Sequence, residues 1–145
     1  MASLEVAADI EISASPADIA GVMFDAVREP EWMSTITGVE LLDPSLEPGA
    51  RQRRTGSVMG QTFTWTSVVD AIHFPHVLVL RTDDGPFVGA VRFDIQRSGG
   101  GSRVRVRTAG ELKDFGFVPT SLVTGPMQSV LQAGLVRLKA IVESA

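Results

Sequence analysis

Hydrophobic and polar residues alternate at the start of the chain. Apolar side chains recur at every second position between residues 4 and 12, mostly with acidic residues between them. This two-residue period predicts a half-buried β-strand, because successive side chains of a strand point to opposite faces of a sheet. The apolar positions of the predicted strand are Leu4, Val6, Ala8, Ile10 and Ile12.

A helix is predicted directly after this strand. Ser15 is suited to cap its N-terminus, Pro16 to occupy its first position, and Asp18 to lie near the positive end of its dipole. Apolar residues continue at helical spacing as far as Val27. The helix is expected to end before Pro30.

From about residue 36 to residue 111, the pattern is typical of strands joined by turns. Residues 61–70 and 87–96 each alternate between a largely apolar face and a more polar one. Consecutive strands with short connections predict an antiparallel meander with one apolar face and one exposed face. The positions predicted on the apolar sides of these two strands are Phe63, Trp65, Ser67, Val69, Phe87, Val91, Phe93 and Ile95.

The chain ends in a long amphipathic helical pattern. Apolar residues from Met127 to Val142 recur at spacings of three and four, with polar side chains on the opposite face. Gly125 and Pro126 either start this helix or kink it, because proline lacks a backbone donor and crowds the preceding turn.

Composition narrows the class of protein. The chain has 145 residues, a formal net charge of -4 and no cysteine, and 44% of its residues are hydrophobic. These values predict a single folded domain over residues 1–145, without disulfides, cysteine-ligated zinc or a basic nucleic-acid-binding face. The N-terminus lacks the pattern of a signal peptide, and no apolar run is long enough to span a membrane. We expect a cytoplasmic, bacterial protein.

The order of predicted elements, together with four stretches of sequence, resembles the START-like helix-grip (SRPBCC) superfamily of polyketide cyclase/dehydrase and lipid-transport proteins. The stretches are "IEISASPADIAGVMFDAVREPEWMSTI" at 10–36, "LEPGARQRRTG" at 46–56, "TFTWTSVVDAIHFPHVLVLRT" at 62–82 and "GPMQSVLQAGLVRLKAIVES" at 125–144. The resemblance implies an α+β helix-grip fold. A curved antiparallel sheet of six to seven strands would wrap around the long C-terminal helix, with two short helices after the first strand.

The resemblance also implies an apolar cavity between the sheet and the C-terminal helix, with Trp32 beside its entrance. Large and adaptable apolar side chains suit such a cavity. The same side chains can instead pack against one another as a filled core, and burial energy does not separate the two readings. The apolar ligand-binding candidates are Trp32, Met33, Phe63, Trp65, Phe93, Met127, Leu131 and Leu135.

Polar anchors for a ligand are expected among Ser67 and the arginines. Residues 51, 53 and 54 span both faces of one predicted strand, so at least one of these three arginines should point inward. Arg81 is a further candidate, although leucines and valines compete for the inner face of its strand. An inward arginine can bind a carboxylate, enolate or phosphate, or it can form an ordinary ion pair. The arginines at 103, 105 and 107 are expected on the exposed face.

His73 and His76 are the only histidines, and Asp70 lies three residues before the first of them. His73 is the candidate general base. A metal site is not expected, because Pro75 marks a turn that would separate the two imidazoles. No motif of a serine hydrolase, zinc protease or nucleotide-binding loop is present, and no cofactor is expected.

Three functions remain open. The first is binding of a small hydrophobic molecule, such as a lipid, a polyketide-like chain or another ring compound. The second is a polyketide cyclase or dehydrase that folds its substrate in the same cavity, although the chain has no tyrosine of the kind that such enzymes often use. The third is a protein-interaction module with a collapsed cavity. A homodimer is compatible with any of them.

Overall fold

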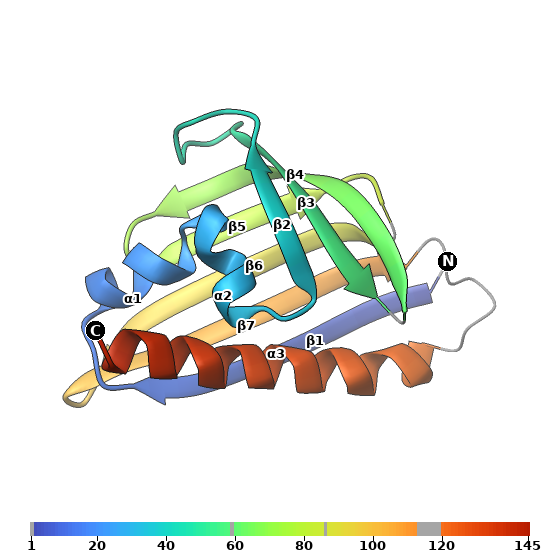
Figure 1. The fold of residues 1–145 in the computed structure, drawn as a ribbon. Coiled ribbons are helices and arrows are strands. Elements are labelled where there is room, and N and C mark those ends of the chain that lie inside the picture. The colour runs from blue at the N-terminus through green and yellow to red at the C-terminus, as the bar shows by residue number, and fades with distance from the viewer. Residues whose placement is uncertain (1, 59, 86, 113–119) are drawn as a thin grey trace.

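Seven antiparallel strands form one sheet in the computed structural model, which describes residues 2–58, 60–85, 87–112 and 120–145. The strand order is β1-β7-β6-β5-β4-β3-β2, so β1 and β2 are the edges. The sheet curves around the long C-terminal helix (Figure 1). The strands are β1 (Ala2–Ile12), β2 (Ile36–Leu41), β3 (Arg51–Val58), β4 (Gln61–His73), β5 (Val77–Thr82), β6 (Phe87–Ser98) and β7 (Gly101–Leu112). This arrangement confirms the predicted α+β helix-grip fold.

The helical segment after β1 is broken. The local pattern predicted one helix as far as Val27, whereas the family resemblance implied two short helices, and two α-helices form. Helix α1 (Pro16–Met23) begins at the expected cap, with the Ser15 hydroxyl accepting a hydrogen bond from the Asp18 backbone. Asp25 then adopts an extended conformation and caps a single 3₁₀ turn at Ala26–Arg28. Helix α2 (Glu29–Trp32) follows and contains Pro30 in its first turn, where the missing proline N–H costs nothing.

Helix α3 (Thr120–Glu143) runs along β1 and across the opening of the curved sheet (Figure 1). It begins before Gly125, so Pro126 lies inside the helix rather than at its start. Its apolar stripe enters the core, and Leu135 and Leu138 are fully buried. Within the described residues, no helix is both long enough and apolar enough to cross a membrane.

Polar side chains of α3 bond to the backbone of the edge strand β1. The Gln128 side chain pairs with both the N–H and the carbonyl of Ala7, and Lys139 donates to the Glu11 carbonyl at 3.1 Å. The Glu143 carboxylate accepts from the Ser13 N–H, just beyond the strand, at 2.7 Å. An exposed strand edge is a template for unwanted pairing. The polar face of α3 therefore covers part of that edge as well as facing solvent.

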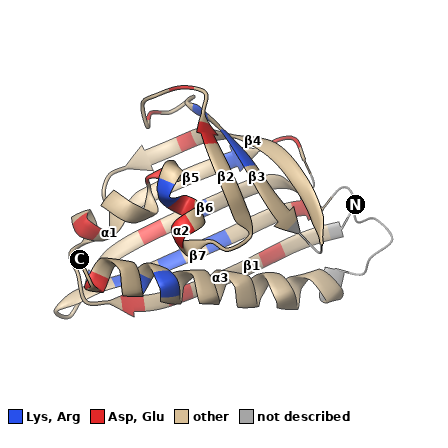
Figure 2. Ribbon diagram, viewed as in Figure 1, with Lys and Arg blue, Asp and Glu red and all other residues tan. Residues whose placement is uncertain are grey.

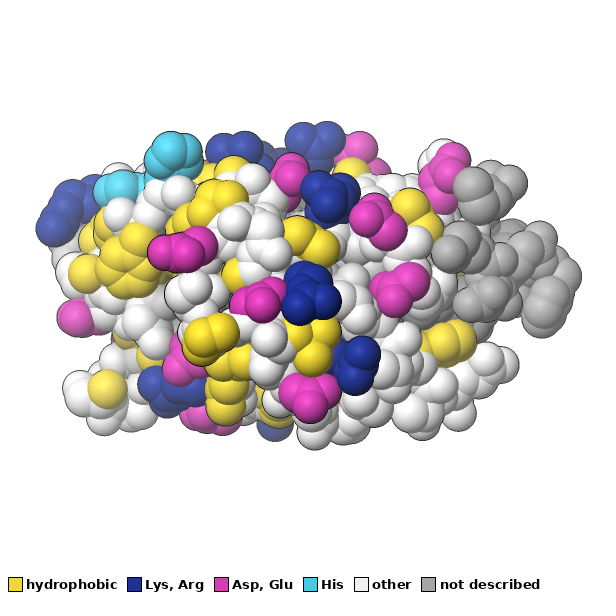
Figure 3. Space-filling model, turned by 90° about the horizontal axis from the view of Figure 1, so that it is seen from above, with side chains coloured by type: hydrophobic (Ala, Val, Ile, Leu, Met, Phe, Trp, Pro, Cys, Tyr) yellow, Lys and Arg dark blue, Asp and Glu magenta, His cyan; other side chains and the backbone are white. Residues whose placement is uncertain are grey.

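The two faces of the sheet carry different chemistry, as the alternation predicted. The arginines of β7 are exposed, and in the sheet they lie beside acidic residues of β1. Figure 2 shows the basic positions of β7 next to the acidic positions of β1. Arg103 pairs with Asp9 and Glu11, and Arg107 with Glu5. These pairs are about half exposed, so each contributes little to stability. The hydrophobic side chains visible from above lie in separate groups among charged ones (Figure 3).

A β-bulge in β4 changes which of its residues face inward. Val69 pairs with Leu80, but the next paired residue is Ala71, opposite Val79, so Asp70 is the additional residue. Ser67 and Val69 therefore face inward before the bulge, and Ile72 takes the inner position after it, opposite the buried Leu78.

Candidate functional site

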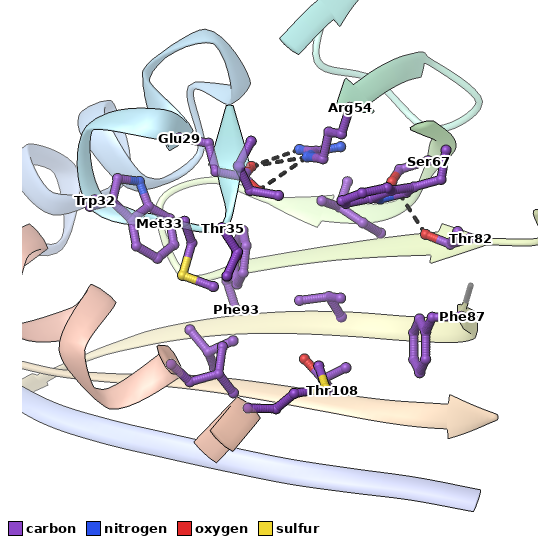
Figure 4. Close-up of a pocket in the computed structure, with 17 residues that line it drawn as sticks. Glu29, Trp32, Met33, Thr35, Arg54, Ser67, Thr82, Phe87, Phe93 and Thr108 are labelled. Atoms are coloured by element: carbon purple, nitrogen blue, oxygen red, sulfur yellow. Dashed lines mark hydrogen bonds and ion pairs between the residues drawn. The ribbon is translucent and has the colours of Figure 1, made fainter. Parts of the chain in front are cut away.

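A largely apolar cavity of about 170 Å³ lies between the sheet, α2 and α3. Strands β3 to β7 form its concave wall, α2 covers one end, and Met127 and Leu131 of α3 close the side opposite the sheet. The cavity is partly open to solvent. Figure 4 shows aromatic, thioether, hydroxyl and charged side chains around this space.

Seven of the ten ligand-binding candidates line this cavity. They are Trp32, Met33, Trp65, Ser67, Phe93, Met127 and Leu131. Leu135 is fully buried in the core behind the cavity wall, and Phe63 is partly buried against that core. These two side chains therefore lie outside the cavity wall. They pack in the core, which was the alternative to ligand binding for all of the apolar candidates.

The placement of Arg81 in the cavity was wrong. Leu80 faces the interior with 4% of its surface exposed, so its neighbour Arg81 points to the outer face. There Arg81 binds Asp70 at 2.8 Å and Asp83 at 3.4 Å. Alternation alone could not decide this, because residues 77–80 are apolar on both faces.

Trp32 belongs to both the core and the cavity wall. Its side chain is 1% exposed, and its ring meets Phe93 edge-on, with centroids 6.1 Å apart. Gly134 of α3 permits the approach from the other side, since a Cβ there would lie 3.6 Å from the indole and 2.8 Å from the Met33 sulfur. The indole Nε1 is buried and has no hydrogen-bond partner among the described residues.

The position of the Trp65 ring depends on a glycine in the neighbouring strand β3. Gly56 of β3 pairs with Phe63, and a Cβ at Gly56 would lie 2.8 Å from the Trp65 ring. The indole therefore occupies the space that a side chain at residue 56 would otherwise fill. It forms part of the cavity wall near the β3–β4 end of the sheet.

A buried ion pair forms the polar part of the wall. Arg54 binds Glu29 of α2 through Nε at 3.1 Å and through Nη2 at 2.8 Å, and Nη2 also donates to Gln52 at 2.9 Å. Both charged side chains are about nine-tenths buried or more. Arg54 is thus the inward arginine expected among the three of β3. Arg51 and Arg53 lie outward, and Arg51 holds the pKa of Asp43 below its usual value by hydrogen bonding.

Buried hydroxyl groups continue the polar side of the wall across the sheet. Gln52, Ser67 and Thr82 are directly paired across β3, β4 and β5, and all three are buried. The Ser67 and Thr82 hydroxyls lie 3.3 Å apart and share a hydrogen bond (Figure 4). Thr108 of β7 adds a further buried hydroxyl side chain to the cavity wall.

Sequence reasoning missed Glu29, Thr82 and Thr108 as wall residues. Glu29 looked like an ordinary acidic residue in a surface helix, and its partner Arg54 is 25 positions away. Thr82 and Thr108 each occupy an inward position next to apolar inward residues of the same strand, at positions 80 and 106. That alternation was the signal that could have identified the two threonines.

His73 lies on the surface after the bulge in β4, away from the cavity wall. His76 is also exposed, and its Nδ1 lies 2.8 Å from the Ile95 carbonyl, which fixes the β4–β5 turn. The histidines are visible together at one side of the surface in Figure 3. Among the described residues, no three histidine or carboxylate side chains converge to hold a metal ion.

Comparison with known proteins agrees with this geometry. Residues 3–143 match the sequence profile of the family described as polyketide cyclase/dehydrase and lipid transport. No curated protein sequence is similar enough to the chain to be counted as a relative.

Three solved structures illustrate the likeness in fold. A Thermus thermophilus protein is 21% identical with a TM-score of 0.82, and a START superfamily protein from Mycobacterium smegmatis is 22% identical with a TM-score of 0.81; each alignment covers 97% of both chains. The Zhui aromatase/cyclase from a Streptomyces strain is 16% identical with a TM-score of 0.77, over 98% of this chain and 94% of that one.

The profile match extends over nearly the whole chain, and the sheet, the gripped helix and the cavity are all in place. The chain therefore belongs to the polyketide cyclase/dehydrase and lipid transport family.

Proposed function

We propose that the protein binds a small, mainly hydrophobic ring compound in the cavity between the sheet and α3. The observation that carries this proposal is the cavity itself, about 170 Å³ in volume and bounded by aromatic, thioether and aliphatic side chains. An engineered apolar cavity of about 150 Å³ in another protein takes up benzene, so a space of about 170 Å³ suits a one-ring compound. The open volume also favours ligand binding over a collapsed interaction module.

Binding is favoured over turnover by the charged groups of the wall. Among the described wall residues, the only charged ones are Glu29 and Arg54, and each is the other's partner. A general base must reach the proton that it removes, and the candidate His73 is on the outer surface. A cyclase or dehydrase activity in this cavity would therefore depend on substrate folding and hydrogen bonding, without a free imidazole.

Native mass spectrometry of gently purified protein tests the proposal. A bound compound should appear as an added mass that disappears when the same sample is denatured, and its mass identifies its class. Protein prepared without ligand should regain an added mass when incubated with excess acetophenone, a neutral one-ring compound. A sample that carries no added mass in either experiment would contradict binding in this cavity.

A further inference from the structure

We infer that the Glu29–Arg54 pair makes the cavity selective for electrically neutral ligands that carry a hydrogen-bond acceptor, such as a ketone, and selective against carboxylates. This inference rests on the proposed function and specifies the ligand class of the same cavity. It differs from the expectation for a lone inward arginine, which would favour an anionic group.

The charge of the wall is the first reason. Nε and Nη2 of Arg54 both bind the Glu29 carboxylate, and the two side chains are 4% and 10% exposed. Within the described wall, no other side chain is charged. The positive charge of Arg54 and the negative charge of Glu29 therefore leave the wall with a net charge of zero. A ligand carboxylate entering this space would lose its hydration and meet a carboxylate as well as a guanidinium. Nothing remains to compensate its charge.

Unused donors are the second reason. Arg54 Nη1 and Trp32 Nε1 are both buried, and neither has a hydrogen-bond partner among the described residues. A buried donor without a partner is unfavourable, because it has lost its hydrogen bond to water. Both side chains belong to the wall of the same cavity. The two donors lack acceptors, and a ligand oxygen would supply one without introducing a charge once a small side-chain movement turns Nη1 or Nε1 toward the cavity.

A purely structural ion pair is the alternative. Glu29 and Arg54 join α2 to β3, and this link could serve only to hold Trp32 in place. In that case, the pair would affect all ligands equally. Selectivity between ligands of the same shape separates the two explanations.

Acetophenone, benzoate and ethylbenzene provide the test, because they have similar size and differ in the group attached to the ring. The ketone is a neutral acceptor, the carboxylate is ionised at neutral pH, and the ethyl group is neither. Binding is followed by NMR titration of the indole N–H signals of the two tryptophans, Trp32 and Trp65, which both lie in the wall.

For the unmodified protein, we expect acetophenone to bind about tenfold more tightly than ethylbenzene, since it satisfies a buried donor. We expect benzoate to bind at least about tenfold more weakly than acetophenone, because of its uncompensated charge. Equal binding of all three would overturn the selectivity while leaving the proposed function intact. Benzoate binding as tightly as acetophenone would also overturn it. No binding by any of them would overturn both.

Substitutions then connect the selectivity to the pair. Glu29→Gln removes the opposing charge, so benzoate should gain affinity relative to acetophenone by about tenfold or more. The double variant Glu29→Gln with Arg54→Met removes both charges and leaves no lone buried ion, which protects the fold. It should retain ethylbenzene binding and show a smaller preference for acetophenone, because only the Trp32 donor remains. An unchanged preference in the double variant would contradict the assignment to this pair.

Discussion

Gly134 of α3 lies directly against Trp32 of α2, so that a Cβ added at residue 134 would be 3.1 Å from the Trp32 carbonyl and 3.6 Å from its indole. The same Cβ would be 2.8 Å from the Met33 sulfur. The absence of a side chain at one position of the long helix thus allows α2 to close the end of the cavity.

Gly134→Ala is expected to destabilise the protein by up to about 2 kcal/mol. Alanine favours a helix over glycine by about 1 kcal/mol, but crowding in a packed interior costs about 1–3 kcal/mol and here involves a backbone oxygen. Urea unfolding measures the change. Gly21→Ala in α1 is the matched control, because it is exposed with open space around it and should stabilise by up to about 1 kcal/mol. Equal stabilisation by both substitutions would contradict the close contact.

Trp32→Ala is expected to cost about 3–5 kcal/mol of unfolding free energy, because a fully buried indole in contact with Phe93 is removed. Chemical denaturation followed by circular dichroism measures the loss. Trp65→Ala should cost less, since Trp65 is only partly buried. A loss below about 1 kcal/mol for Trp32→Ala would be inconsistent with its place in the core.

Val91→Phe is expected to fill the cavity and weaken acetophenone binding by about tenfold or more, with unfolding free energy changed by no more than about 1 kcal/mol. Val91 lies in the cavity wall, between Leu80 and Thr108 in the sheet register. Val88→Phe is the control, because residue 88 lies on the opposite face of the same strand. It should leave binding unchanged. Equal affinities for the two variants would exclude this cavity as the site.

Glu143→Gln is expected to destabilise the protein at neutral pH and to have progressively less effect in acid. The Lys139 side chain and the Ser13 backbone N–H hold the pKa of Glu143 below its usual value. A carboxyl group whose pKa is lowered on folding stabilises the native state above its unfolded pKa, and this contribution disappears as the pH falls through the folded pKa. Thermal melts of both proteins at several pH values should converge in acid. A constant difference would exclude this linkage.

Much of the fold follows from local patterns. The alternation from Leu4 to Ile12, the Ser15 cap and the periodic stripe of the last helix each predicted the element that forms there. These signals are reliable because each depends on residues that are close in sequence. The bulge at Asp70 and the pairing of Glu29 with Arg54 depend on partners elsewhere in the chain, and neither has a local signal.

In the candidate site too, some residues could be predicted from local sequence patterns, and others depend on partners elsewhere in the chain. Trp32, Trp65 and Phe93 were predicted because large apolar side chains on the inner face of this fold have few other places to lie. The sequence predicted only that at least one of the three arginines of β3 points inward. It did not identify Arg54, because polar residues occupy both faces of this strand. Arg81 was misplaced because residues 77–80 are apolar on both faces, so its side of the sheet depends on the pairing of β4 with β5.

The bulge at Asp70 changes which alternate residues of β4 face inward, from odd-numbered positions before it to even-numbered positions after it. If Asp70 were present but regularly paired, strict alternation from Ser67 and Val69 would carry Ala71 and His73 to the inner face, and Ile72 outward. Pairing all of these residues without a bulge would therefore exchange an isoleucine for an imidazole on the inner face, whereas deleting Asp70 would leave Ile72 inside. In this fold, the presence of one bulge can determine whether the interior contains a titratable group, and two proteins with the same residues around this turn can have different interior chemistry.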